Sequence, residues 1–173
     1  MTMSSSRSDA STPKPGGALA LPDLPLTGGC QCGAVRYRVT GAPVTFYLCH
    51  CSRCQRQSGS AFGESLQLRP EDLQIEGELQ ARAVTGGSGR AGEIRFCPAC
   101  GTRITHRVEG SPVVVLKPGT LDAPGWLRPV AELFIEERQP WLPALPGVAQ
   151  YEGAPPMPEL HAAFARMLAE GAA

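Results

Sequence analysis

The sequence contains no long apolar run and no block of charges of one sign. Its longest apolar runs, such as residues 113–116, are far shorter than the roughly 20 residues that span a bilayer. The 16 basic and 16 acidic residues give a formal net charge of zero. The basic residues are almost all arginines and are scattered along the chain. These absences argue against a membrane-spanning protein, a polybasic membrane-binding surface and a nucleic-acid-binding surface.

The sequence also lacks an export signal. Its first 15 residues are polar, and the apolar stretch at residues 16–21 is too brief for the core of a secretory signal. We therefore expect a cytoplasmic protein, because nothing directs it into an oxidising compartment. Thiols stay reduced in the cytoplasm.

Cysteine, in contrast, is abundant: the chain has seven. An odd number cannot pair completely into disulfides. The cysteines fall into three tight groups, which are Cys30/Cys32, Cys49/Cys51/Cys54 and Cys97/Cys100. In a reduced compartment, this grouping indicates metal ligation or thiol chemistry.

The remaining pattern predicts a mainly β protein with three regions. Residues 1–26 are rich in Ser, Pro, Gly and Ala and are expected to form a disordered tail. Residues 27–142 form the predicted β domain, and residues 143–173 a Pro-rich link followed by a short helix. The strand candidates are residues 34–40, 44–49, 61–68, 79–85, 93–96, 103–108, 113–118 and 131–136. In the first of these, Val35, Tyr37 and Val39 alternate with polar residues.

The motif Cys97-Pro-Ala-Cys100-Gly101 is the strongest local signal for a metal site. Two cysteines at this spacing turn both thiolates toward one metal, and the glycine tolerates the positive φ that such a turn needs. Cys30 and Cys32 share a face of an extended segment and would complete a closed structural zinc site. The alternatives are unmetallated core cysteines or a redox pair at Cys97/Cys100. A redox pair fits poorly, because no helix begins at this motif.

The remaining cysteines, Cys49, Cys51 and Cys54, predict a second zinc site with three ligands. If the chain is extended up to Cys51, then Cys49 and Cys51 share a face and His50 points away. The fourth position would stay open, as in catalytic rather than structural zinc sites. Three thiolates on zinc make a weak Lewis acid that suits a thiolate substrate better than a hydrolytic water.

The same motifs resemble the glutathione-dependent formaldehyde-activating enzyme family, which includes centromere protein V-like proteins. The resemblance covers about residues 27–142. The motifs are Gly29-Cys30-Gln31-Cys32-Gly33, Cys49-His50-Cys51-Ser52-Arg53-Cys54-Gln55, Ser58-Gly59-Ser60-Ala61-Phe62, Phe96-Cys97-Pro98-Ala99-Cys100-Gly101-Thr102 and Phe134-Ile135-Glu136-Glu137-Arg138-Gln139-Pro140-Trp141.

This resemblance implies an Mss4-like, zinc-bound β-sheet fold with two zinc ions per chain. It implies a structural zinc at Cys30, Cys32, Cys97 and Cys100 and a catalytic zinc at Cys49, Cys51 and Cys54. The activity named for the family joins formaldehyde and glutathione into S-(hydroxymethyl)glutathione, which makes it a carbon–sulfur lyase.

The leading hypothesis is therefore a zinc-dependent carbon–sulfur lyase that acts on a small-molecule thiol, with glutathione as a candidate, and a small aldehyde such as formaldehyde. Arg53, Gln55, Ser58 and Ser60 are candidate substrate contacts, although the last three are equally suited to capping a turn or short helix. His106 is a weaker candidate for a proton shuttle. Arg53 and Arg56 are candidates for offsetting the charge of the thiolates or binding a substrate carboxylate. The sequence does not decide which basic residue would bind such a carboxylate, and the candidates are Arg36, Arg53, Arg56, Arg95 and Arg103.

Two other functions remain open from the sequence. A non-catalytic, zinc-stabilised protein-binding module would have a water or a neighbouring side chain as the fourth ligand of this zinc. A protein side chain in that position would favour the binding module, and an accessible pocket above the metal would favour the enzyme. A methionine sulfoxide reductase on a related fold would need a redox-active cysteine beyond the zinc ligands, and none follows Cys100.

Overall fold

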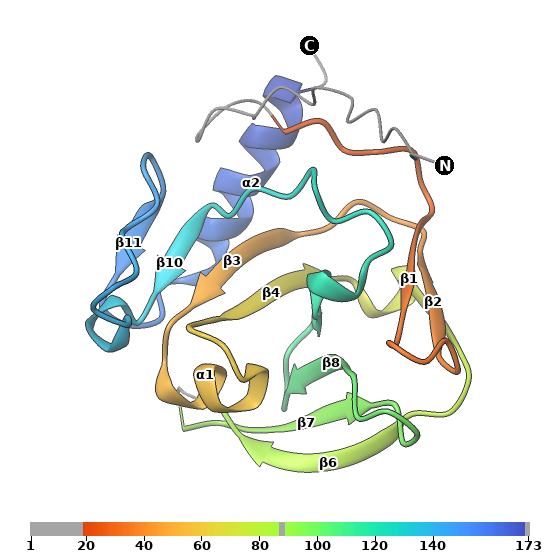
Figure 1. Cartoon of the computed structure of the whole chain (residues 1–173). Helices are drawn as coiled ribbons and strands as arrows, with labels where there is room; N and C mark the ends of the chain where they lie inside the picture. Colours follow the sequence, from red (N-terminus) through yellow and green to blue (C-terminus); the bar gives the residue numbers. More distant parts are fainter. Residues whose placement is uncertain (1–18, 87–88, 172–173) are drawn as a thin grey trace, which may run out of the picture.

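The computed structural model describes residues 19–86 and 89–171, which fold into a mainly β protein with two sheets (Figure 1). The larger sheet has eight strands in the order β11-β10-β3-β4-β9-β8-β7-β6. Its strands are β3 (Thr45–Cys49), β4 (Gly63–Leu68), β6 (Gln80–Thr85), β7 (Ala91–Phe96), β8 (Arg103–Val108), β9 (Val114–Leu116), β10 (Ala131–Leu133) and β11 (Ala149–Tyr151). Neighbouring strands are antiparallel, except that β10 is parallel to both β3 and β11.

The smaller sheet places β2 (Arg36–Val39) between β1 (Leu26–Gly29) and β5 (Leu73–Glu76). The alternation predicted from the sequence is present, since Tyr37 and Val39 are buried and Arg36 and Arg38 are exposed. One face of this sheet therefore packs into the common hydrophobic core, which the larger sheet also lines with residues such as Leu66 and Ile104.

Two α-helices and three 3-10 helices complete the described chain. The short α1 (Ser52–Ser58) follows β3, and the longer α2 (Met157–Gly171) lies near the C-terminus. The 3-10 helices are η1 (Pro70–Asp72), η2 (Pro118–Thr120) and η3 (Ile135–Glu137). Neither α-helix is long and apolar enough to cross a bilayer, a finding that applies to the described residues.

Helix α2 packs against β3 and is part of the main core (Figure 1). Leu160 and Phe164 are buried at helical spacing, as the sequence predicted for this segment. The Thr45 hydroxyl also donates to the Leu160 carbonyl across 3.2 Å. The helix therefore packs against the strand that leads into the 49–54 segment.

The predicted tail is too long. Leu19 is buried, and its amide donates to the Met167 carbonyl of α2 across 3.0 Å, while Leu26 begins β1. The apolar side chain of Leu19 thus packs against the C-terminal helix, which the sequence did not predict. Residues 1–18 of the proposed tail lie outside the described residues.

All eight predicted strands are present, several with shorter bounds than expected, and the mainly β class with a short C-terminal helix is confirmed. Three short strands were missed, β1, β5 and β11, the last of them inside the segment predicted as a Pro-rich link. The end of the 131–136 candidate is also wrong. Phe134 adopts a left-handed conformation (φ 57°), which ends β10 and starts η3.

We predict that Phe164→Ala destabilises the whole domain by about 3–5 kcal/mol, because it removes a fully buried aromatic ring from the core. Denaturant unfolding of the variant and the wild type measures this difference. Arg166→Ala, at an exposed position of the same helix, is the control and should unfold like the wild type. Equal stability of all three proteins would contradict the packing of α2 against β3.

Candidate functional site

The structure brings the seven cysteines together as two clusters. The sulfur atoms of Cys30, Cys32, Cys97 and Cys100 all lie within 4.8 Å of one another. The sulfur atoms of Cys49, Cys51 and Cys54 meet the same limit in a second cluster. These are the two groups that the sequence analysis formed, and each is compatible with a zinc ion. Their role as metal ligands stays a prediction.

The four-cysteine cluster joins two similar turns. In the first, the Gly33 amide donates to the Cys30 carbonyl across 3.1 Å, and in the second the Gly101 amide donates to the Cys97 carbonyl across 2.9 Å. Gly33 and Gly101 adopt φ values of 81° and 74°, where a side chain would be strained. The Val35 amide also points at the Cys30 sulfur, 3.2 Å away, as expected for a thiolate ligand.

The three-cysteine cluster spans the end of β3 and the first turn of α1. Cys49 is the last residue of β3, and Cys51 caps the helix by accepting a hydrogen bond from the Cys54 amide across 3.4 Å. Hydrogen bonds from the Cys49 and Cys54 thiols lower the pKa of Cys51 to about 2. The shared hydrogen bond with Cys51 raises the pKa of Cys49. The cluster therefore favours one thiolate before any metal binds.

Helix α1 lies close to β4 because Gly63 has no side chain. A Cβ atom on Gly63 would lie 3.0 Å from the Cys54 Cβ and 3.4 Å from its sulfur. The Gln57 side-chain amide donates to that sulfur across 3.3 Å. These contacts hold Cys54 beside the strand.

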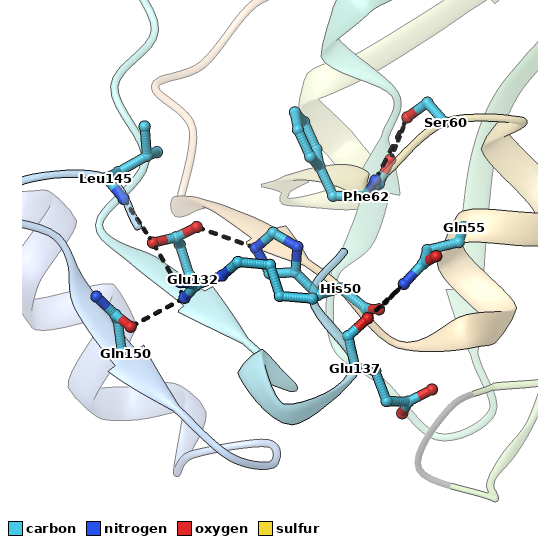
Figure 2. A network of polar contacts seen from close by, with 9 residues as sticks. His50, Gln55, Ser60, Phe62, Glu132, Glu137, Leu145 and Gln150 are labelled. Atoms are coloured by element: carbon cyan, nitrogen blue, oxygen red, sulfur yellow. Dashed lines mark hydrogen bonds and ion pairs between the residues drawn. The ribbon is translucent and has the colours of Figure 1, made fainter. Parts of the chain in front are cut away.

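His50 is turned away from the cluster, as strand alternation predicted. Its side chain is fully buried, and its Nε2 lies 3.0 Å from Oε1 of the buried Glu132 on β10 (Figure 2). The other carboxylate oxygen of Glu132 accepts from the Leu145 amide across 2.9 Å. His50 therefore ties β3 to β10. Among the residues that the structure describes, no histidine, cysteine or carboxylate makes a fourth member of the three-cysteine cluster.

A cavity of about 320 Å³ opens onto all three cysteines of this cluster. The strands of the large sheet provide polar groups on its wall, among them Ser65, Gln67 and His106. Helix α2 contributes Met157 and His161. The His161 Nε2 lies 2.9 Å from the Gln67 Oε1, whereas Nδ1 of His106 is buried without a partner among the described residues. Burial lowers the pKa of His106 well below its usual value, so this imidazole is neutral at pH 7.

None of the four predicted substrate contacts is among the lining residues of this cavity. The Gln55 side-chain amide donates to the carbonyls of His50 and Glu137, at 2.6 and 2.7 Å. Ser58 and Ser60 both donate to the Phe62 carbonyl, at 2.9 and 2.7 Å (the second bond is drawn in Figure 2). These three side chains thus stabilise the turns around α1, and Ser58 and Ser60 also line a second cavity beside Cys54. Their role as substrate contacts stays a prediction.

Arg53 has a backbone partner as well, since its guanidinium donates to the Thr85 carbonyl at the end of β6.

Two other basic residues lie close enough to the three-cysteine cluster to interact with it electrostatically. The charge of Cys54 raises the pKa of both Lys117 and Arg103, and the charge of Cys49 also raises the pKa of Lys117. Burial, together with the nearby charge of Arg103, lowers the pKa of Lys117 to about 8. The position of Lys117 near the cluster could not be predicted from the sequence, because only strand pairing brings residues 103 and 117 near residue 54.

Together these features define a class of protein: a mainly β fold that carries one closed cluster of four cysteines and one open cluster of three. The comparison with known families is more specific. The sequence model of the glutathione-dependent formaldehyde-activating enzyme family matches residues 25–137. This chain belongs to that family.

Two individual proteins are also similar to this chain. A Halomonas elongata protein named "Putative glutathione-dependent formaldehyde-activating enzyme" is 32% identical over 84 residues. The alignment covers 46% of this chain and 54% of that protein, so the chain spans about half the length of this curated relative. A crystal structure of a Rhodobacter sphaeroides protein aligns at a TM-score of 0.45 and 20% identity, over 73% of this chain and 99% of that protein.

We predict that the two clusters differ in their effect on folding. The purified protein should contain two zinc ions per chain by metal analysis. Cys30→Ser should lose one zinc and most of the folded structure, because the four-cysteine cluster joins segments 65 residues apart. Cys49→Ser should lose one zinc and stay folded by circular dichroism. The opposite pattern, with Cys49→Ser unfolded and Cys30→Ser folded, would reverse the two assignments.

Proposed function

We propose that this protein is a zinc-dependent carbon–sulfur lyase that joins a thiol and a small aldehyde into an S-hydroxymethyl adduct. Glutathione and formaldehyde are the leading substrates, because the family is described by that reaction. The observation that carries the proposal is the cavity of about 320 Å³ that opens onto Cys49, Cys51 and Cys54. A cytoplasmic location is part of the proposal, since the seven cysteines must stay reduced to act as ligands.

The donor atoms of both clusters suit zinc. Soft thiolates are preferred zinc ligands, and four of them close a tetrahedral structural site. Cys30, Cys32, Cys97 and Cys100 would hold such an ion, and Cys49, Cys51 and Cys54 would hold the second. The cluster of three supports an enzyme over a binding module. A binding module is expected to close its site with a fourth side chain, and the described residues provide none.

A zinc ion at the three-cysteine cluster would supply one piece of chemistry: it keeps a thiol substrate in the nucleophilic thiolate form at neutral pH. The thiolate sulfur then attacks the carbonyl carbon of the aldehyde, and a carbon–sulfur bond forms. The π electrons of the carbonyl group move to its oxygen, which takes up the proton that the thiol released. The overall reaction adds one thiol to one aldehyde and needs no oxidant or reductant.

Residues of the cavity would hold the two reactants together and carry the proton. His106 is the candidate for the second role, because it lines the cavity and its buried Nδ1 has no partner among the described residues. His161 suits it less well, because its Nε2 is already paired with Gln67. Confinement of both reactants makes the addition nearly unimolecular, which accelerates it without changing its equilibrium.

The activity prediction follows from this mechanism. The wild type should accelerate formation of S-(hydroxymethyl)glutathione from glutathione and ¹³C-formaldehyde, measured by NMR exchange spectroscopy because the reaction also proceeds without an enzyme. Cys51→Ser should lose this acceleration, since it removes a sulfur atom from the cluster, while the serine hydroxyl can still cap α1. A wild-type protein with two zinc ions that neither binds a thiol nor accelerates the exchange would reject the proposed function.

A second prediction concerns the proton carrier. His106→Phe should lower the catalysed exchange rate about 100-fold, the usual minimum contribution of a positioned acid or base. Zinc content and glutathione affinity should stay as in the wild type. His161→Phe is the matched control, because it changes the other histidine of the same cavity. An equal loss of rate in the two variants would assign both histidines to cavity shape instead of proton transfer.

A further inference from the structure

A second cavity, of about 520 Å³, lies on the Cys54 side of the three-cysteine cluster. Gln57, whose amide donates to the Cys54 sulfur, and Gly63, which contacts Cys54, both line it. Two cations also line this cavity, Arg103 at the start of β8 and Lys117 after β9.

Among the described residues, neither cation forms an ion pair with a carboxylate. Nε and Nη1 of Arg103 are buried and have no hydrogen-bond partner among the described residues. The Lys117 ammonium donates to a neutral group, the Glu64 carbonyl, across 3.0 Å. A buried, unpaired guanidinium is costly, so this arrangement indicates an anion that the folded chain does not itself provide.

The described acidic side chain in this cavity is Glu64, and it offsets only part of the charge. Burial raises the pKa of Glu64, which disfavours its charged form. Two cations and one carboxyl group leave the cavity positive. Three thiolates on a zinc ion would also attract the cations, so the anion has two possible sources, the metal cluster and a ligand.

The sequence alone left several arginines as equal candidates for binding a substrate carboxylate, and the structure separates them. Arg36 forms an ion pair with Asp122, Arg95 pairs with Glu93, and Arg53 donates to a backbone carbonyl. Arg56 is exposed on α1. Arg103 alone among these five combines buried, unpartnered N–H groups with a cavity at the cluster.

We infer that Arg103 and Lys117 form a carboxylate-binding subsite that selects thiol substrates carrying a carboxylate group. This inference rests on the proposed function and specifies its substrate class. The planar guanidinium of Arg103 matches a carboxylate through two parallel hydrogen bonds, and Lys117 adds a point charge. The subsite lies beside Cys54, so a carboxylate bound there orients its thiol relative to the three-cysteine cluster.

The experiment compares glutathione, which has two carboxylates, with glutathione diethyl ester, which has none. Calorimetry on the zinc-loaded full chain should show that the wild type binds glutathione at least about tenfold more tightly than the ester. Arg103→Gln should abolish this preference while leaving ester affinity and zinc content unchanged. Arg95→Gln, on the neighbouring strand β7, is the matched control and should retain the preference. If Arg103→Gln fails to fold, Lys117→Met provides the same test.

Other outcomes would overturn the inference. Loss of zinc in a folded Arg103→Gln, or equal weakening of both thiols, would mean that Arg103 balances the charge of the metal cluster. A wild type that binds both thiols equally would also overturn it while leaving the proposed function intact. If the wild type binds neither thiol, the proposed function fails, and titration with glutarate tests the subsite separately. Glutarate binding that Arg103→Gln removes would support the subsite, and no glutarate binding would overturn it.

Discussion

The crowding of sulfur atoms is the constraint on which the rest of this structure depends. Four sulfurs lie within 4.8 Å of one another in one cluster and three in the other. Thiolates at this separation repel one another unless a cation or shared protons neutralise them. The fold therefore supplies N–H groups, such as the Val35 and Cys54 amides, that point at the sulfurs. The strands are arranged so that these turns meet.

The two clusters are held by different parts of the fold. The four-cysteine cluster joins two turns that each close on themselves, at Gly33 and Gly101. The three-cysteine cluster instead occupies the junction of β3 and α1, where His50 turns to the opposite side and pairs with Glu132 (Figure 2). The His50–Glu132 pair holds the end of β3 on the side away from the three sulfur atoms. The histidine in the middle of the motif thus holds the strand and leaves the cluster with three ligands.

Cysteine spacing and strand alternation were enough to predict the fold class, the grouping of the sulfurs and the orientation of His50. Both signals are local, because two or three residues decide which way each side chain points. The bonding of the polar and basic side chains around the three-cysteine cluster was less predictable. Gln55, Ser58 and Ser60 are polar and close to the cysteines, but they bond to backbone groups of adjacent turns. Arg103 and Lys117 are far from Cys54 in sequence, and only the order of strands in the sheet brings them near it.

The wall of the cavity at the three-cysteine cluster combines residues inside and outside the segment that the family model matches. The cysteines and His106 lie within residues 25–137, where the family model matches. Met157 and His161 lie on α2, outside that match, yet line the same cavity. Buried Leu160 and Phe164 fix the helix against the sheet, so its cavity-facing side chains have a defined position. A segment beyond the matched residues thus helps to shape the cavity of this chain.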